Sequence, residues 1–294
     1  MLQAAAILRP RAILIENVST VRHAREGVIE AVEKHLPRVG PGYRVAHRVI
    51  DVSKLGVAQA RKRHVLLALA DELSPDEVLD EVLSATCQRT TRWAICDLVK
   101  TSGRPGLMDQ VAGASEENRR RMAWFFSDEG RGQYNLPNPL RPPCHRDKVH
   151  TYYAVYGRLR WDEPAPTLTS GFYSTGQGRH VHPDVSRTIT AREAARLQSF
   201  PDFYDFDSAR TRNALATLLG NAVPPLLVRT IASAVIRRWR GAAVEMPADA
   251  TAGRPAPALP QPAERDVDQK GRRLPRLPVP VDRPVPQLQM FVPG

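Results

Sequence analysis

The sequence contains very little cysteine: three residues in 294, namely Cys87, Cys96 and Cys144. Three thiols cannot build the disulfide framework of a small secreted protein, so we expect a reducing, intracellular setting. The sequence also lacks an uninterrupted apolar run of the roughly 18 residues that a membrane span needs. Arg9 and Arg11 interrupt the apolar start of the chain, and no small-residue cleavage site follows, which argues against a signal peptide. We therefore predict a cytoplasmic protein that does not enter a membrane.

Positive charge, by contrast, is in excess. Lys and Arg number 42 against 31 Asp and Glu, which gives a formal net charge of +11 at pH 7. Residues 241–294 hold 11 of the 26 prolines, and we interpret them as a disordered, Pro-rich tail because such spacing excludes helices and inner strands. The tail has 7 basic and 6 acidic residues, so residues 1–240 carry +10 of the charge. A basic folded part indicates a polyanionic partner such as nucleic acid, although a protein without such a partner can also be basic.

The middle of the chain combines basic and aromatic residues. Residues 119–160 contain nine Lys or Arg against three acidic residues, and residues 122–173 contain 10 of the 18 aromatic residues. Basic side chains neutralise phosphates and aromatic rings stack on bases, so this composition is typical of nucleic-acid binding. A small irregular domain that uses its aromatic residues as a core would look the same.

Hydrophobic patterning predicts the α/β fold class. Short apolar runs rich in β-branched residues favour strands, and we expect the first of them to be a buried parallel strand. Thr190 and Glu193 have the spacing of a capping box, which starts a helix that stops before Pro201. Strands interspersed with helices at these distances indicate the edge of an α/β sheet. The predicted strands cover 11–17, 43–52 and 64–70, and the predicted helices cover 22–36, 75–83, 116–126, 190–198 and 224–240.

Four short motifs follow one another along the chain. Glu16–Val18 (ENV) ends the first predicted strand, where the carboxyl end of a strand faces the ligand crevice of an open α/β sheet. Gln59–Arg63 (QARKR) leads into the third strand, and arginines two positions apart in an extended segment point to the same side. Arg192–Pro201 (REAARLQSFP) and Gly220–Pro225 (GNAVPP) follow. Gly220 suits a tight turn, and the helix that starts beyond it would offer free amides to a ligand.

In this order the motifs resemble the C-terminal part of a bacterial DNA (cytosine-5) methyltransferase, over roughly residues 7–240. The segment from Tyr156 to His182 also resembles the lead-in to the third motif in one branch of that family. The resemblance implies a partial Rossmann-like methyltransferase sheet, a small irregular target recognition domain, double-stranded DNA as the substrate and S-adenosylmethionine as the cofactor. It implies a partial catalytic domain at 1–72, a target recognition region at 73–189, helices that return to the catalytic domain at 190–240, and the tail at 241–294.

The resemblance also implies roles for individual residues. Glu16 matches the acid that engages ring nitrogen 3 of a cytosine flipped out of the duplex. Arg61 and Arg63 match the pair that holds the flipped base and nearby phosphates. The residues implied at the cofactor pocket are Asn221, Ala222 and Val223, and those implied at the DNA are Gln59, Arg158, Thr167 and Arg179.

The motifs of the family's first half have no counterpart before Glu16. An FxGxG turn for the cofactor and a Pro-Cys-Gln with the nucleophilic cysteine are both missing, and neither Thr86–Gln88 (TCQ) nor Pro143–His145 (PCH) replaces the latter. We therefore expect a separate N-terminal polypeptide to supply the nucleophile and most of the cofactor site. Two alternatives stay open: a DNA-binding subunit or truncated remnant without catalysis, and a basic enzyme that acts on a small molecule.

A metal site is not expected from the sequence. Cys144, His145 and His150 lie close together, but one cysteine and two histidines without a partnering cluster fall short of a structural zinc set.

Overall fold

A computed structural model describes residues 2–21, 27–98, 106–147 and 155–241, which belong to one compact unit. Apart from Gly241, the predicted tail at 241–294 lies outside the described residues. So does part of the helix predicted at 22–36, of which the structure describes α2, Val28–His35.

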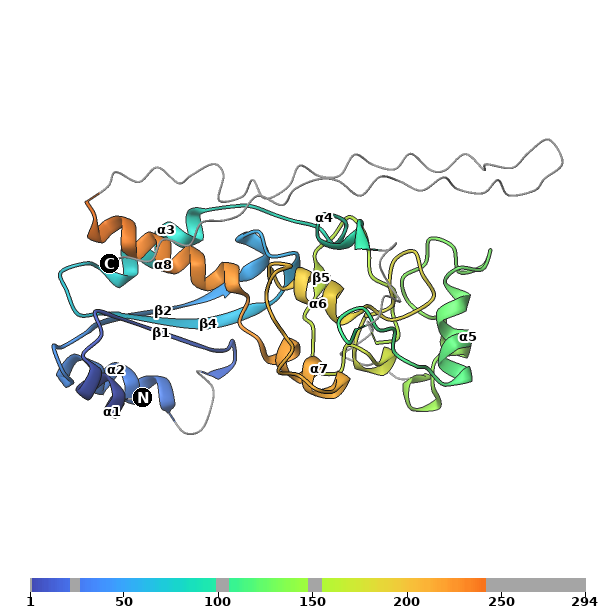
Figure 1. Cartoon of the computed structure of the whole chain (residues 1–294), viewed down its shortest axis with the longest axis horizontal. Coiled ribbons are helices and arrows are strands. Elements are labelled where there is room, and N and C mark those ends of the chain that lie inside the picture. The colour runs from blue at the N-terminus through green and yellow to red at the C-terminus, as the bar shows by residue number, and fades with distance from the viewer. Residues whose placement is uncertain (1, 22–26, 99–105, 148–154, 242–294) are drawn as a thin grey trace. The chain divides into compact units, whose positions relative to one another are not determined.

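A three-stranded antiparallel sheet forms the first part of the fold (Figure 1). The strands are β1 (Ala12–Val18), β2 (Arg44–Asp51) and β4 (Lys62–Leu69), with β4 between the other two. The expectation of a parallel first strand is wrong, because β1 runs antiparallel to β4 from Ala12 opposite Leu69 to Val18 opposite Arg63. The expected burial is not complete either, because Ala12 to Asn17 are half-buried and Val18 is exposed. An apolar run favours a strand, but its direction and its burial depend on which neighbours it meets.

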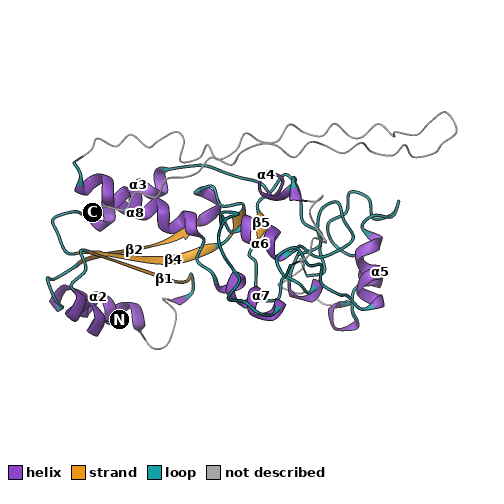
Figure 2. Cartoon of the chain, in the orientation of Figure 1, coloured by secondary structure: helices purple, strands orange, loops and turns teal. Residues whose placement is uncertain are grey.

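Helices cover both faces of this sheet (Figure 2). On one face, α3 (Pro75–Ser84) and α8 (Pro225–Trp239) pack against Val65, Leu67 and Leu69 of β4. On the other face, α1 (Leu2–Leu8) and α2 pack against Leu66 and Ala68. Successive side chains of β4 therefore alternate between two apolar layers, as expected for the central strand of an α/β sheet. The α/β class predicted from the sequence is confirmed.

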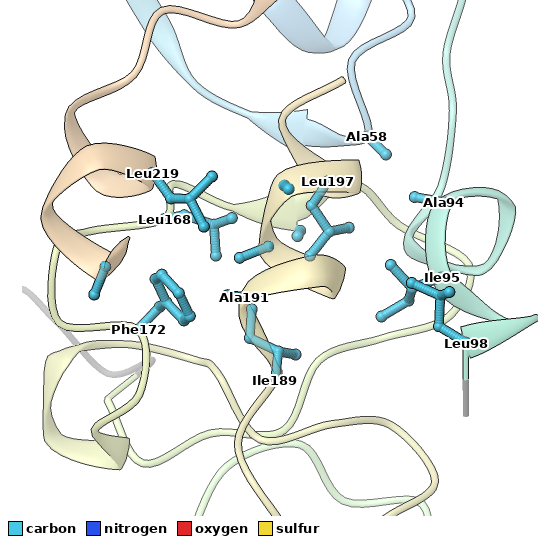
Figure 3. Close-up of a cluster of buried hydrophobic side chains, with 14 of the residues drawn as sticks. Ala58, Ala94, Ile95, Leu98, Leu168, Phe172, Ile189, Ala191, Leu197 and Leu219 are labelled. Carbon is cyan, nitrogen blue, oxygen red and sulfur yellow. The ribbon is translucent and has the colours of Figure 1, made fainter. Parts of the chain in front are cut away.

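The second part of the fold consists of short helices and loops around its own core (Figure 3). We call this core the recognition cluster; its larger buried residues are Ile95, Leu98, Leu159, Leu168, Phe172, Ile189, Leu197, Leu215 and Leu219. The remaining elements are α4 (Thr91–Ile95), α5 (Glu116–Trp124), β3 (Gln59–Ala60), β5 (Ala165–Pro166), α6 (Ala191–Leu197) and α7 (Arg212–Asn221). Short 3₁₀ helices cover Leu36–Arg38, Val52–Lys54, Asn138–Leu140, Pro143–His145 and Thr175–Gln177.

Some helices pack against a different part of the fold from the one in which the predicted domain boundaries place them. The helix α3 lies within the predicted recognition region at 73–189, yet its buried residues Val78, Leu79 and Val82 pack on the sheet. Conversely, the segment 190–240 is expected to return to the catalytic domain, but the apolar residues of α6, and of α7, which the sequence did not predict, join the recognition cluster. In the predicted segment 190–240, α8 is the helix that packs against the sheet.

One helical stretch, Arg212–Trp239, is long and apolar enough to be considered as a membrane span, with 28 residues and a mean hydropathy of 1.4 in its best window. It consists of α7 and α8, which Ala222–Pro224 separate in non-helical conformations. Leu215 and Leu219 of α7 pack in the recognition cluster, while Leu227 and Ile231 of α8 pack against the sheet. We therefore interpret the stretch as two core helices, each apolar on its packed face.

Candidate functional site

Two of the residues predicted to be catalytic meet at one end of the sheet. Because β4 is antiparallel to its neighbours, its N-terminal end lies beside the C-terminal ends of β1 and β2. There the Arg63 Nε atom lies 2.6 Å from Glu16 Oε1, in an ion pair. The two side chains are 13% and 21% exposed, so the pair is partly shielded but still reachable from solvent.

The charges of Glu16, Arg61 and Arg63 act on one another. Burial lowers the pKa of Arg63, and the carboxylate of Glu16 opposes that shift. Burial, followed by the neighbouring charge of Arg63, lowers the pKa of Arg61 to about 10, again against an opposing effect of Glu16. The two arginines that the sequence predicts on one side of an extended segment thus both lie within electrostatic reach of Glu16, and Arg61, with a pKa of about 10, is still protonated at neutral pH.

Arg61 itself is turned inward. It is 3% exposed, and its Nη1 and Nη2 atoms donate to the carbonyl oxygens of Leu168 and Gly220, each at 2.9 Å. The expectation that Arg61 grips a flipped base or a phosphate therefore needs correction, because its terminal donors are already used inside the protein. Strand periodicity shows the side to which a side chain points, but it does not show what covers that side.

Gln59 is also part of the interior. It is fully buried, and its Oε1 atom accepts a hydrogen bond from the Leu168 amide at 3.1 Å. The structure gives no support to the expected DNA contact of this residue, since a fully buried amide does not present itself to a base edge or a phosphate.

The residues expected at the cofactor pocket lie at the junction of α7 and α8. Asn221 is the last residue of α7 and is exposed, whereas Ala222 and Val223 are half-buried. Val223 packs against the sheet cluster, by which we mean the apolar core between the sheet and the helices α3 and α8. The Arg61 bond to the Gly220 carbonyl joins this junction to the end of the sheet that carries Glu16.

The predicted conformation around Gly220 is wrong. Gly220 belongs to the last turn of α7, and a Cβ atom there would lie 2.2 Å from the Ser170 amide nitrogen, so close backbone packing is what requires glycine. The expected free amides at the start of α8 are also missing. Pro224 and Pro225 have no N–H group, and the Leu226 amide donates to Ser199 Oγ at 3.1 Å.

The three other residues expected to contact DNA make contacts within the predicted recognition region. The Arg158 guanidinium lies over the rings of Phe126 and Tyr134, and its Nη1 atom donates to the Phe125 carbonyl at 3.2 Å. Arg179 donates to the Tyr134 carbonyl at 2.9 Å and to the Asn135 side chain, and burial lowers its pKa.

Thr167 is exposed, but its hydroxyl donates to the Ala60 carbonyl at 2.8 Å. The side chains of Arg158, Thr167 and Arg179 therefore all have partners within the protein, and their expected contact with DNA stays a prediction.

Accessible basic side chains occur instead on and beside α5. Arg119 and Arg120 are 63% and 79% exposed and both pair with Glu116, while Arg131 is 81% exposed. Exposed pairs of this kind contribute little to stability, so these arginines are able to exchange Glu116 for a phosphate. The run of three arginines at 119–121 was the sequence signal for this surface, although Arg121 is buried and donates to the Leu140 carbonyl.

The charged residues of the motif Arg192–Pro201 form ion pairs that hold α6 in place, a role that the sequence analysis missed. Arg192 makes a bidentate pair with Asp109, and Arg196 pairs with both Asp97 and Asp202. Gln198 is fully buried and its side-chain amide donates to the Leu219 carbonyl. The motif therefore ties α6 to four separate segments. The signal available in the sequence was the helical spacing of Arg192 and Arg196, which places both on neighbouring positions of one helix face.

None of the three cysteines has the surroundings of a nucleophile. Burial, followed by the charge of Asp97, raises the pKa of the Cys96 thiol, whereas a reactive thiol needs a lowered one. Cys87 is half-buried with its sulfur against Gly56, and Cys144 is exposed in a 3₁₀ helix. Within the described ranges no group of three or more His, Cys, Asp or Glu side chains is arranged to hold a metal ion, and His150 lies outside them.

Comparisons with known proteins agree with the motif order. Residues 2–237 match the family model for C-5 cytosine-specific DNA methylases. The chain is 42% identical over 221 residues to the type II methyltransferase M1.BsuMI of Bacillus subtilis, which covers 75% of this chain and 50% of the relative. It is 33% identical to the type II methylase M.HgiDII of Herpetosiphon aurantiacus, over 80% of this chain and 67% of the relative.

A solved structure shares the fold. It is a prophage-encoded E. coli protein described as a putative DNA modification methyltransferase, with a TM-score of 0.51 and 19% identity over 81% of this chain and 72% of that one. The chain thus spans about half of the length of M1.BsuMI and two thirds of that of M.HgiDII.

Proposed function

Because the chain belongs to the C-5 cytosine-specific DNA methylase family, we propose that it is the C-terminal portion of a cytoplasmic DNA (cytosine-5) methyltransferase. The substrate would be a cytosine flipped out of duplex DNA, since its reacting atoms are hidden in the base stack. The observation that carries this proposal is the Glu16–Arg63 ion pair, 2.6 Å apart at the end of the sheet and joined through Arg61 to the α7–α8 junction.

Glu16 is the proposed acid of the reaction. When a nucleophile attacks carbon 6 of cytosine, electron density moves to ring nitrogen 3, which becomes more basic. A carboxyl group that shares a proton with this nitrogen stabilises the developing charge, and such acid catalysis contributes typically about 10²–10⁴-fold. Arg63 holds the Glu16 carboxyl group in place before the base arrives, and it is the member of the arginine pair that stays partly exposed.

The described residues would form one wall of the cofactor site. Asn221 and Val223 are the proposed contacts for S-adenosylmethionine, which supplies the methyl group when it is bound. We propose that a separate N-terminal polypeptide supplies the nucleophilic cysteine and the remainder of this pocket. The sheet supports such an addition, because within the described residues β1 pairs with β4 alone and its other edge has unpaired amides and carbonyls.

The recognition region would bind DNA through the exposed arginines at α5. Arg119, Arg120 and Arg131 extend from the described surface, and the carboxylates that pair with them, Glu116 and Asp128, are themselves exposed. Guanidinium groups bind phosphate oxygens without reading sequence, so these residues would position the duplex.

The test is methyl transfer by reconstitution. The purified chain alone should transfer no methyl groups to DNA, and addition of the product of the adjacent upstream reading frame, if it encodes FxGxG and PCQ motifs, should restore activity. Glu16→Gln in the restored enzyme should lower kcat by roughly 10²–10⁴-fold with little change in DNA affinity. The matched control is Glu33→Gln, which removes a carboxylate that pairs with His47, away from the proposed acid.

Three results would contradict the proposal. Activity of the chain alone would exclude a separate catalytic partner, and an unchanged rate for Glu16→Gln would exclude Glu16 as the acid. Salt-dependent DNA binding without activity in any combination would favour a DNA-binding subunit instead.

A further inference from the structure

We propose that Arg61 is a positioning residue that, together with Gln59, fixes the recognition region to the end of the sheet where Glu16 and Arg63 lie. The expected effect of Arg61 on DNA binding rests on the proposed function, whereas its effect on the junction between the two segments can be measured without DNA.

The junction begins as a short parallel strand pair. Gln59 of β3 lies opposite Ala165 of β5, and the Ala165 amide donates to the Ala58 carbonyl at 2.9 Å. The Thr167 hydroxyl extends this pairing by donating to the Ala60 carbonyl at 2.8 Å. Two residues per strand are too few to hold two segments that are more than 100 residues apart in sequence. The side chains of Gln59 and Arg61 supply the additional bonds.

These two side chains satisfy both polar backbone groups of Leu168. Gln59 Oε1 accepts from the Leu168 amide at 3.1 Å, and Arg61 Nη1 donates to the Leu168 carbonyl at 2.9 Å. The Leu168 side chain is itself buried in the recognition cluster, so the anchored residue is part of the core of that region. Side chains from the segment that leads into β4 therefore hold the backbone of Leu168. In a regular β-ladder, backbone groups would make these hydrogen bonds.

Arg61 also reaches a third segment. Its Nη2 atom donates to the Gly220 carbonyl at 2.9 Å, directly before Asn221. The backbone of Gly220 packs so closely on Thr169 and Ser170 that a Cβ atom would lie 2.5 Å or less from both. One planar guanidinium thus spans two carbonyls on segments that already touch, a geometry that a single ammonium group does not reproduce.

The burial of Gln59 and Arg61 and their position close to Arg63 in the sequence also support a positioning role. Arg61 is 3% exposed and Gln59 is fully buried, so neither presents the surface that a phosphate or a base would need. Arg63 follows two residues later and carries the ion pair with Glu16. A change in the path of residues 59–61 would therefore move the catalytic pair relative to both the recognition region and Asn221.

Hydrogen exchange of the full 294-residue chain tests the structural part. Arg61→Lys keeps the charge but cannot bridge both carbonyls, so amides in 165–170 and 217–222 should exchange roughly 5–30-fold faster, as expected for the loss of one or two hydrogen bonds. Amides of β4 from 65 to 69 should be unaffected. Thr167→Val, which alters an exposed side chain at the same junction, should accelerate exchange in 165–168 without endangering the fold.

A matched control separates local loosening from general destabilisation. Ile231→Val removes one methyl group from the sheet cluster, away from the junction, and should not change exchange in 165–170 selectively. Unchanged exchange at 165–170 and 217–222 in Arg61→Lys would overturn the proposal.

The salt dependence of DNA binding distinguishes positioning from phosphate contact. Loss of one phosphate contact lowers the slope of log K against log salt concentration by about 0.9. Arg61→Met should weaken binding of a duplex while leaving this slope unchanged, and Arg120→Ala, at an exposed arginine, should lower it. A slope that falls in Arg61→Met would overturn the positioning role. If the wild-type chain bound no DNA, the proposed function would fail at that step, while the exchange experiment would still decide the role of Arg61.

Discussion

At the scale of single residues, buried polar groups around the start of α6 form one connected network. Glu193 is 1% exposed, and its carboxylate accepts from the Thr190 amide at 2.8 Å, which completes the predicted capping box. The same carboxylate makes a bidentate pair with Arg187 at 2.7 and 2.8 Å. The His182 Nε2 atom lies 3.6 Å from it, and His182 Nδ1 accepts from the Asp184 amide. Such a network is stable only while the histidine stays neutral.

This network predicts a loss of stability in mild acid. Burial lowers the pKa of both His180 and His182 to about 4, with Glu193 opposing the shift of His182. An unfolded histidine has a pKa of about 6.5, so between about pH 6.5 and 4 the unfolded chain binds protons that the folded chain does not. The stabilisation is fully present above that window and falls as the pH falls, by up to about 1.4 kcal/mol per pH unit for each histidine.

Denaturant unfolding at a series of pH values measures this dependence. His182→Asn keeps an acceptor for the Asp184 amide but does not titrate, so its free energy of unfolding should depend less steeply on pH than that of the wild type. His35→Asn, which changes an exposed side chain at the end of α2, is the matched control and should follow the wild type. The prediction fails if His182→Asn and the wild type have equal slopes.

At the scale of secondary-structure elements, local signals identified most helices. Ser74 and Thr190 accept hydrogen bonds from the first turns of α3 and α6, and Pro225 stands in the first turn of α8. The helix α7 was missed, although Thr211 caps it and Leu215 and Leu219 have helical spacing. Its last residues resemble a turn in sequence, because a glycine and two prolines lie close together there. Local composition cannot distinguish a glycine that is needed for a positive φ angle from a glycine that is needed because another backbone segment packs too closely for a Cβ atom.

Gly220→Ala tests that distinction. A methyl group at this position would overlap the backbone of Ser170, so α7 or the segment 168–170 must move, and we expect a loss of roughly 1–3 kcal/mol as for other overpacked sites. Gly113→Ala is the matched control, because a Cβ atom there has no neighbour within 4 Å. Thermal or denaturant unfolding measures both. Equal stability of the two variants would show that the close packing at Gly220 is easily relieved.

At the scale of the whole molecule, the total of 42 Lys and Arg overstates the number of free basic side chains. Many arginines pair with carboxylates within the fold and so are not available as isolated charges. Examples are Arg48 with Asp76 and Asp80, Arg187 with Glu193, Arg192 with Asp109, Arg196 with Asp97 and Asp202, and Arg237 and Arg238 with Glu81. The exposed arginines at α5 therefore represent the accessible basic surface better than the count of 42 Lys and Arg does.

The distribution of charge predicts that the tail has little influence on DNA affinity. Residues 242–294 contribute 7 basic and 6 acidic residues, so their deletion changes the net charge by only one unit. The slope of log K against log salt concentration should then stay within about one phosphate contact of the full-length value. A titration at several salt concentrations checks this, and a markedly smaller slope after deletion would assign the tail a direct part in binding.

The sequence by itself determined the family and the α/β class, and it indicated Glu16, Arg63 and Asn221 as candidate site residues. Motif order, hydrophobic periodicity and helix caps are properties of the sequence itself, and each can be recognised without knowledge of distant contacts. Only the tertiary structure decided which motif residues face outward. Gln59 and Arg61 are covered by Leu168 and Gly220, which lie more than 100 residues further along the chain. Burial of a polar side chain depends on what folds over it, so two residues expected to bind substrate prove to hold the protein together.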